Sequence, residues 1–133
     1  NITASIQARE LRDGRIAVAY NDICATGRDG ESPVPPWIKD REAFLAKCEI
    51  TDEAAVWGVP RGPLAISTSA DLGLTWTCEM TVESDATLRS AHDEKGAFTG
   101  DYSYPSIIQT RDGNVQISYS YLRDCIKHVT IGI

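Results

Sequence analysis

The chain has 133 residues, enough for one domain with its own core, and 13 basic against 19 acidic residues give a net charge of −6. An acidic chain without a cluster of Lys and Arg is a poor partner for nucleic acid or for an anionic membrane surface. Its apolar runs are too short to cross a bilayer, and no signal-peptide pattern opens it, so these residues leave the compartment open. Asn1 already reads as the start of a strand region, which leaves room for an upstream segment that was removed or that lies on another chain.

The first predicted element is a hairpin. Residues 5–11 form a strand-like run, the chain turns at Asp13-Gly14, and residues 16–20 return with apolar side chains at alternate positions. Asp-Gly between two alternating runs is among the strongest short-range signals for a β-hairpin.

A long insertion is predicted next, over residues 22–62. It is rich in Gly, Pro and charged residues and has no strand period. Within it, residues 40–48 predict a short helix, with Asp40 as N-cap and Ala43, Phe44 and Cys48 on an apolar face.

The turn over residues 69–76 organises the middle of the chain. Asp71 bonds its own downstream backbone and Gly73 accepts positive φ, so the stretch predicts a tight turn between strands over residues 64–68 and 76–82. Cys78 falls in the apolar register of the second strand, which predicts a buried thiol. The four widely spaced cysteines, without a C-x-x-C pair, leave a disulfide open.

After a polar loop over residues 84–100, strands are predicted over residues 104–110, 114–121 and 125–133. The Asp112-Gly113 turn repeats the first hairpin at a distance of 99 residues (112 minus 13), so the two hairpins form an internal repeat. The prediction is therefore all-β. It comprises four strands over residues 1–83 with the insertion between the second and the third, then the loop, and three further strands over residues 101–133.

The turn matches S-x-D-x-G-x-T-W and resembles the Asp-box of sialidase-type β-propellers, through Ser69, Asp71, Gly73, Thr75 and Trp76. Residues 1–21, the run Trp57-Gly-Val-Pro-Arg-Gly-Pro-Leu64, and Asp101-Tyr-Ser-Tyr-Pro-Ser-Ile-Ile-Gln-Thr110 with Ile126-Lys-His-Val129 resemble the C-terminal part of the same family. The resemblance implies a six-bladed propeller of which residues 1–133 supply roughly the last third: one full blade over residues 1–83, the loop, and three strands of the last blade over residues 101–133. The remaining blades would come from an upstream segment or another chain, so we expect a fragment, a processed product or one part of a split propeller. Pairing with copies of itself is a further alternative.

The resemblance also implies site residues. Tyr104 stands where the family carries its tyrosine nucleophile, and Tyr102 would share its face if the strand begins at Tyr102. Arg61 is a candidate clamp for a substrate carboxylate, against the alternative of a surface ion pair. Ser5 and Gln7 are candidate partners of sugar hydroxyls. Asp101 stands where many relatives carry Glu, and Arg9 and Arg123 are weaker candidates.

The function implied is that of an exo-glycoside hydrolase acting on terminal acidic sugars through an axial tyrosine, inactive without the rest of the propeller. A phenol suits such substrates because a carboxylate nucleophile would be repelled by the sugar's own carboxylate. The alternatives are a non-catalytic propeller that serves as an interaction or structural subunit, and a polysaccharide lyase on the same scaffold. No cofactor is expected and no metal site, since His92 and His128 lie far apart and no carboxylates cluster at ligand spacing. Lys127 and His128 are expected to be structural.

Overall fold

The computed structural model describes residues 5–23, 34, 37–47, 61–85, 87–88 and 100–133. The chain divides into two compact units, one made of residues 1–3 and 23–59 and the other of residues 4–22 and 60–133. Most of the predicted insertion over 22–62, and residues 86 and 89–99 of the predicted loop, lie outside the described residues.

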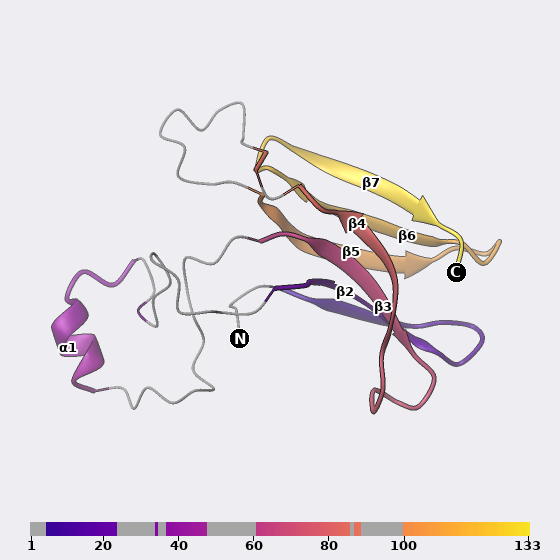
Figure 1. Cartoon of the computed structure of the whole chain (residues 1–133), viewed down its shortest axis with the longest axis horizontal. Coiled ribbons are helices and arrows are strands. Elements are labelled where there is room, and N and C mark those ends of the chain that lie inside the picture. Colours follow the sequence, from indigo (N-terminus) through magenta and orange to yellow (C-terminus); the bar gives the residue numbers. More distant parts are fainter. Residues whose placement is uncertain (1–4, 24–33, 35–36, 48–60, 86, 89–99) are drawn as a thin grey trace. The chain divides into compact units, whose positions relative to one another are not determined.

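The larger unit contains a four-stranded antiparallel sheet. Its strands are β1 (Gln7–Glu10), β2 (Ile16–Asn21), β3 (Leu64–Ser69) and β4 (Thr77–Glu83), paired in chain order (Figure 1). The Asp-Gly turn joins β1 to β2, and the Asp-box turn joins β3 to β4. All six residues of β3 are buried, because β3 has a hydrogen-bonded neighbour on both sides.

A second antiparallel sheet in the same unit contains β5 (Tyr102–Gln109), β6 (Val115–Tyr121) and β7 (Cys125–Ile131), again in chain order. The all-β prediction is confirmed, and the described strands follow the predicted order. β5 begins two residues earlier than predicted, at Tyr102 rather than Tyr104.

The two sheets share one apolar core, built from alternate residues of each. Its members are Leu11, Ala17, Ala19, Leu64 and Ile66 with Tyr102, Ile107, Val115, Ile117, Tyr119, Leu122 and Ile131. Burying an aliphatic or aromatic side chain of this size contributes about 1.5–3 kcal/mol. Polar contacts join β1 and the turn after it to β5: Ile107 N donates to Gln7 Oε1 at 2.5 Å, and Arg12 N donates to Gln109 Oε1 at 2.9 Å.

The prediction that the Cys78 thiol is buried is wrong, because Cys78 is an exposed free cysteine. It pairs with Ser67, on the face of β3 opposite Leu64 and Ile66, which belong to the core. Moreover, β4 is the last strand of its sheet. Alternation identifies the two faces of a strand but not which of them is covered. Cys125 is also exposed and free, and Cys24 and Cys48 lie outside the described residues.

In the smaller unit, α1 (Arg41–Leu45) confirms the predicted helix but is shorter. Asp40 is its N-cap as predicted, because Asp40 Oδ1 accepts from Ala43 N at 2.9 Å. No residue of α1 is buried; of the predicted apolar face, Ala43 is exposed, Phe44 is half-buried, and Cys48 lies outside the described residues.

Candidate functional site

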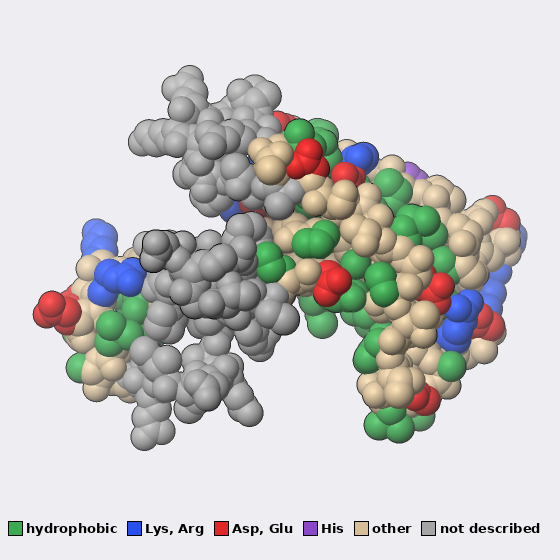
Figure 2. Space-filling view, viewed as in Figure 1, with side chains coloured by type: hydrophobic (Ala, Val, Ile, Leu, Met, Phe, Trp, Pro, Cys, Tyr) green, Lys and Arg blue, Asp and Glu red, His purple; other side chains and the backbone are tan. Residues whose placement is uncertain are grey.

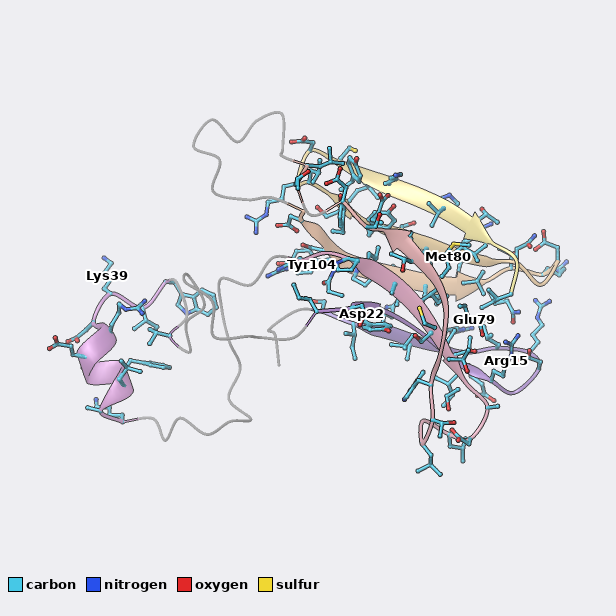
Figure 3. All side chains as sticks on the ribbon, viewed as in Figure 1. Arg15, Asp22, Lys39, Glu79, Met80 and Tyr104 are labelled. Carbon is cyan, nitrogen blue, oxygen red and sulfur yellow. The ribbon has the colours of Figure 1, made fainter. Side chains whose placement is uncertain are left out.

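Tyr104 has a backbone conformation that is unusual for an aromatic residue. Its φ is +54°, in the left-handed region, and the pairing of β5 with β6 shifts register between Ser103 and Ser106. A β-bulge of this kind turns a side chain out of the regular alternation, and bulges are frequent beside active sites. The Tyr104 side chain is consequently 61% exposed. Figure 3 shows it at the end of the sheets where β5 begins, while Arg15 lies in the turn between β1 and β2.

Arg61 lies against Tyr104. Its guanidinium carbon is 5.1 Å from the centroid of the Tyr104 ring, within the range of a cation–π contact. The Nη1 atom of Arg61 is buried and has no hydrogen-bond partner among the described residues. A buried charged donor without a partner is costly, by about 1–3 kcal/mol or more. The arrangement therefore offers an unused donor beside an exposed phenol.

The backbones that carry these two side chains are joined directly. Tyr102 N donates to the Arg61 carbonyl at 3.0 Å. The side-chain amide of Asn21 donates to the same carbonyl at 2.6 Å and to the Tyr102 carbonyl at 2.9 Å. A Cβ atom on Gly62 would come within 2.9 Å of the Gly100 carbonyl, so the two segments approach closely.

Tyr102 and Tyr104 do not lie on the same face of β5. A strand that begins at Tyr102 is expected to place them on one face, but Tyr102 is buried and Tyr104 is exposed. Tyr102 is fully buried, and its hydroxyl donates to the Asp85 carbonyl at 2.6 Å. Burial, and then the negative charge of Glu83, raise the pKa of Tyr102 to about 12. The bulge at Tyr104 causes the separation, since it interrupts the two-residue period.

Asp101 is buried, and both oxygens of its carboxylate accept hydrogen bonds from other side chains. One carboxylate oxygen accepts from the Ser103 hydroxyl, and the other accepts from Arg123 Nε at 2.6 Å. Gln7 uses its side-chain oxygen for the bond to Ile107 N described above. Ser5, just before β1, is exposed. Of the predicted site residues, the structure brings Arg61 and Tyr104 into contact.

The Asp-box residues form the bonded turn that the motif predicts. Asp71 accepts from the Ser69 hydroxyl at 2.8 Å, from Thr75 N at 2.8 Å and from the Thr75 hydroxyl at 2.6 Å. These hydrogen bonds, mainly those from Thr75 and then the one from Ser69, lower the pKa of Asp71 to about 2. Trp76 Nε1 donates to the Gly73 carbonyl at 3.0 Å. The turn follows Ser69 at the end of β3, whereas Arg61 precedes the start of β3.

In a comparison with protein families, residues 1–117 match the BNR repeat-like domain. The chain belongs to this family. Comparisons with curated proteins and with solved structures gave no match. The match confirms the resemblance read from the Asp-box, and two antiparallel sheets are the expected form of BNR repeat-like blades.

The BNR repeat-like domain also holds a second tyrosine, Tyr119, in contact with a glutamate. Glu83 accepts from the Tyr119 hydroxyl and from Lys127 Nζ, and Lys127 lies 4.7 Å from the centroid of the Tyr121 ring. Tyr119 is 1% exposed, and burial with the bond to Glu83 raises its pKa. This tyrosine is therefore part of the packing between sheets and not an accessible nucleophile.

None of the sequence motifs singles out Asn21. The available signal was its register: Asn21 is in the same alternation as Ala17 and Ala19, so a polar residue occupies a core position.

His128 Nε2 lies 3.2 Å from the Gln116 side-chain oxygen, and His92 is outside the described residues.

Neither a metal-ligand cluster nor a membrane-spanning helix occurs in the part of the domain that the structure describes. No three or more His, Cys, Asp or Glu residues gather there as metal ligands would. Within the same residues, no helix has the length and apolar character needed to span a membrane.

Proposed function

We propose that this chain supplies part of the substrate site of a sialidase-like exo-glycoside hydrolase that acts on terminal acidic sugars. The observation that carries the proposal is the contact between Arg61 and the exposed Tyr104, with Arg61 Nη1 buried and unpartnered among the described residues. A guanidinium is suited to a carboxylate, which accepts two parallel N–H bonds from it.

In this proposal Tyr104 is the nucleophile and Arg61 holds the substrate carboxylate. A neutral phenol can approach a carbon next to a carboxylate without charge repulsion, and an adjacent cation stabilises the phenolate character that develops during attack. Both Asp101 oxygens are engaged by Ser103 and Arg123, so we assign Asp101 to support of the site and not to proton transfer. The acid and base would come from other blades.

We also propose that further blades cover the open surfaces of the two sheets. Ile108 and Ile126 are 51% and 74% exposed on the second sheet, on the face opposite its core residues. Among the described strands, β4 and β7 are the last of their sheets and each has a strand partner on one side. Natural proteins cover such edges because they otherwise promote aggregation.

A second candidate function is that of a non-catalytic interaction or structural subunit. The observation that favours it is again Asp101, which is buried in an ion pair where a glutamate is frequent in the relatives that the sequence resembles. In that case Arg61 and Tyr104 would bind an anionic group without turnover.

The test combines binding and hydrolysis. By NMR titration, we expect the chain to bind N-acetylneuraminic acid and not N-acetylmannosamine, and Arg61→Ala to weaken binding about 10- to 100-fold through loss of a charge-assisted hydrogen bond. Tyr104→Phe keeps the ring and is expected to bind within a few-fold of the wild type. Arg111→Ala, at an exposed arginine of the turn between β5 and β6, is the control.

The isolated chain should not hydrolyse aryl sialosides or uronosides, and turnover by it would contradict the need for other blades. Equal affinity of wild type and Arg61→Ala would contradict the proposal that Arg61 binds the substrate carboxylate. Binding that persists without turnover after the other blades are supplied would favour the non-catalytic subunit.

A further inference from the structure

Asn21 is a polar residue in a core position. It is 6% exposed and alternates with Ala17 and Ala19, which belong to the apolar core between the sheets. A buried amide is unfavourable unless its hydrogen-bonding groups are satisfied. Its position in the core therefore calls for a specific reason.

The Asn21 amide joins two segments that lie far away in the sequence. Its Nδ2 donates to the carbonyl of Arg61, 40 residues away, and to the carbonyl of Tyr102, 81 residues away. One of these carbonyls belongs to the arginine of the candidate site, and the other precedes Tyr104 by two residues. Both amide protons are thereby used on the backbones that present the Arg61–Tyr104 pair.

The orientation of the amide follows from these donors. Asn21 Oδ1 is buried and has no hydrogen-bond partner among the described residues. Rotating the amide by half a turn would direct that oxygen at two carbonyl oxygens, which also accept, and would lose both bonds. The buried, unpartnered oxygen is a cost of about 1–3 kcal/mol that accompanies the two donor bonds.

We infer that Asn21 is a positioning residue, which sets the separation of the Arg61 guanidinium from the Tyr104 ring by clamping their backbones. Its effect on the geometry is independent of any ligand, whereas its effect on affinity rests on the proposed function. The close approach of Gly62 to the Gly100 carbonyl leaves this spacing little freedom, so a clamp at Asn21 acts on a tightly constrained junction.

The inference is tested with Asn21→Leu, which keeps a similar volume and removes both donors. The matched control is Asn114→Leu, because Asn114 Nδ2 also donates, at 2.9 Å, but to Asp112 in the exposed turn between β5 and β6. The first readout is the NMR shift of the Arg61 side-chain protons, which the Tyr104 ring current displaces, with Tyr104→Leu as the reference. The second is affinity for N-acetylneuraminic acid.

We expect Asn21→Leu to lose at least half of the ring-current displacement of the Arg61 signals. The affinity for N-acetylneuraminic acid should fall about tenfold, since a small misplacement of binding groups is costly. Asn114→Leu should change neither. An unchanged displacement in Asn21→Leu overturns the inference. If Arg61→Ala loses the probe but Asn21→Leu keeps it, the proposed function stands and the positioning role fails. If the wild type does not bind N-acetylneuraminic acid, the proposed function fails. The ring-current shift then still tests the positioning role of Asn21, because it needs no ligand.

A measurement on the unmodified chain covers the case in which Asn21→Leu does not fold. The Nδ2 protons of Asn21 should exchange with solvent at least tenfold more slowly than those of Asn114, because they are buried and bonded to two carbonyls. Equal exchange rates would overturn the inference.

Discussion

At the scale of single residues, four non-glycine residues of the described chain adopt left-handed φ values, and all lie at turns or at the bulge. They are Leu72, Tyr104, Leu122 and Arg123, with φ between 52° and 63°. Leu122 and Arg123 form the turn between β6 and β7, where the Asp101 carbonyl accepts from Leu122 N at 2.8 Å. Left-handed φ is unfavourable for residues with a Cβ, so each conformation is imposed by its surroundings.

Leu72 offers a direct test of this cost. Its side chain is 85% exposed in the Asp-box turn, and Figure 2 shows hydrophobic side chains at the tip of that hairpin. Leu72→Asn should therefore raise the free energy of unfolding by up to about 1 kcal/mol, since Asn tolerates left-handed φ and little burial is lost. Urea denaturation measures it. Leu74→Asn is the matched control, because Leu74 is equally exposed and its φ is not positive. An equal change in both variants would contradict the backbone explanation.

At the scale of elements, the Asp-box turn links its own stability to pH. The folded-state pKa of Asp71 is about 2, below the ordinary value of 3.8, because Thr75 and Ser69 donate to its carboxylate. The unfolded chain therefore takes up this proton at a higher pH than the folded chain does. The stabilisation by Asp71 is complete above pH 4 to 5 and is lost as the pH falls towards 2.

Asp71→Asn should flatten the dependence of stability on pH between about 5 and 2. At pH 7 the variant should also be less stable than the wild type, since an amide group cannot accept all three bonds. Urea midpoints at several pH values provide the measurement. Glu10→Gln, at an exposed carboxylate of β1, is the control. A wild-type slope that persists in Asp71→Asn would show that other carboxylates carry it.

At the scale of the whole molecule, a polar contact accompanies the apolar packing of the two sheets. Glu83, at the end of β4, accepts from Tyr119 on β6 and Lys127 on β7. Tyr102 and Tyr121 pack next to this contact, with ring centroids 5.6 Å apart. The first sheet is thereby bonded to two strands of the second.

Tyr119→Phe should lower the free energy of unfolding by about 1–2 kcal/mol, because it removes a buried bond to a charged acceptor. Tyr104→Phe is the matched control and should leave stability nearly unchanged, since Tyr104 is 61% exposed. Chemical denaturation compares the two variants. Equal stability of Tyr119→Phe and wild type would mean that the hydroxyl contributes nothing to the joining of the sheets.

The sequence by itself determined the local structure of this protein. Alternation and the Asp-Gly and Asp-box turns predicted the described strands in their order, and Asp40 predicted the start of α1. These features depend on residues close together in the chain, so they can be read without knowledge of the fold.

Only the tertiary structure decided what depends on distant segments. It placed the Arg61 guanidinium over Tyr104, buried Tyr102, and exposed Cys78 on the last strand of its sheet. It also brought Asn21 to the carbonyls of Arg61 and Tyr102. The physical reason is that a two-residue period assigns side chains to faces, whereas the packing of one sheet on another decides which face is covered, and a single bulge at Tyr104 alters that period.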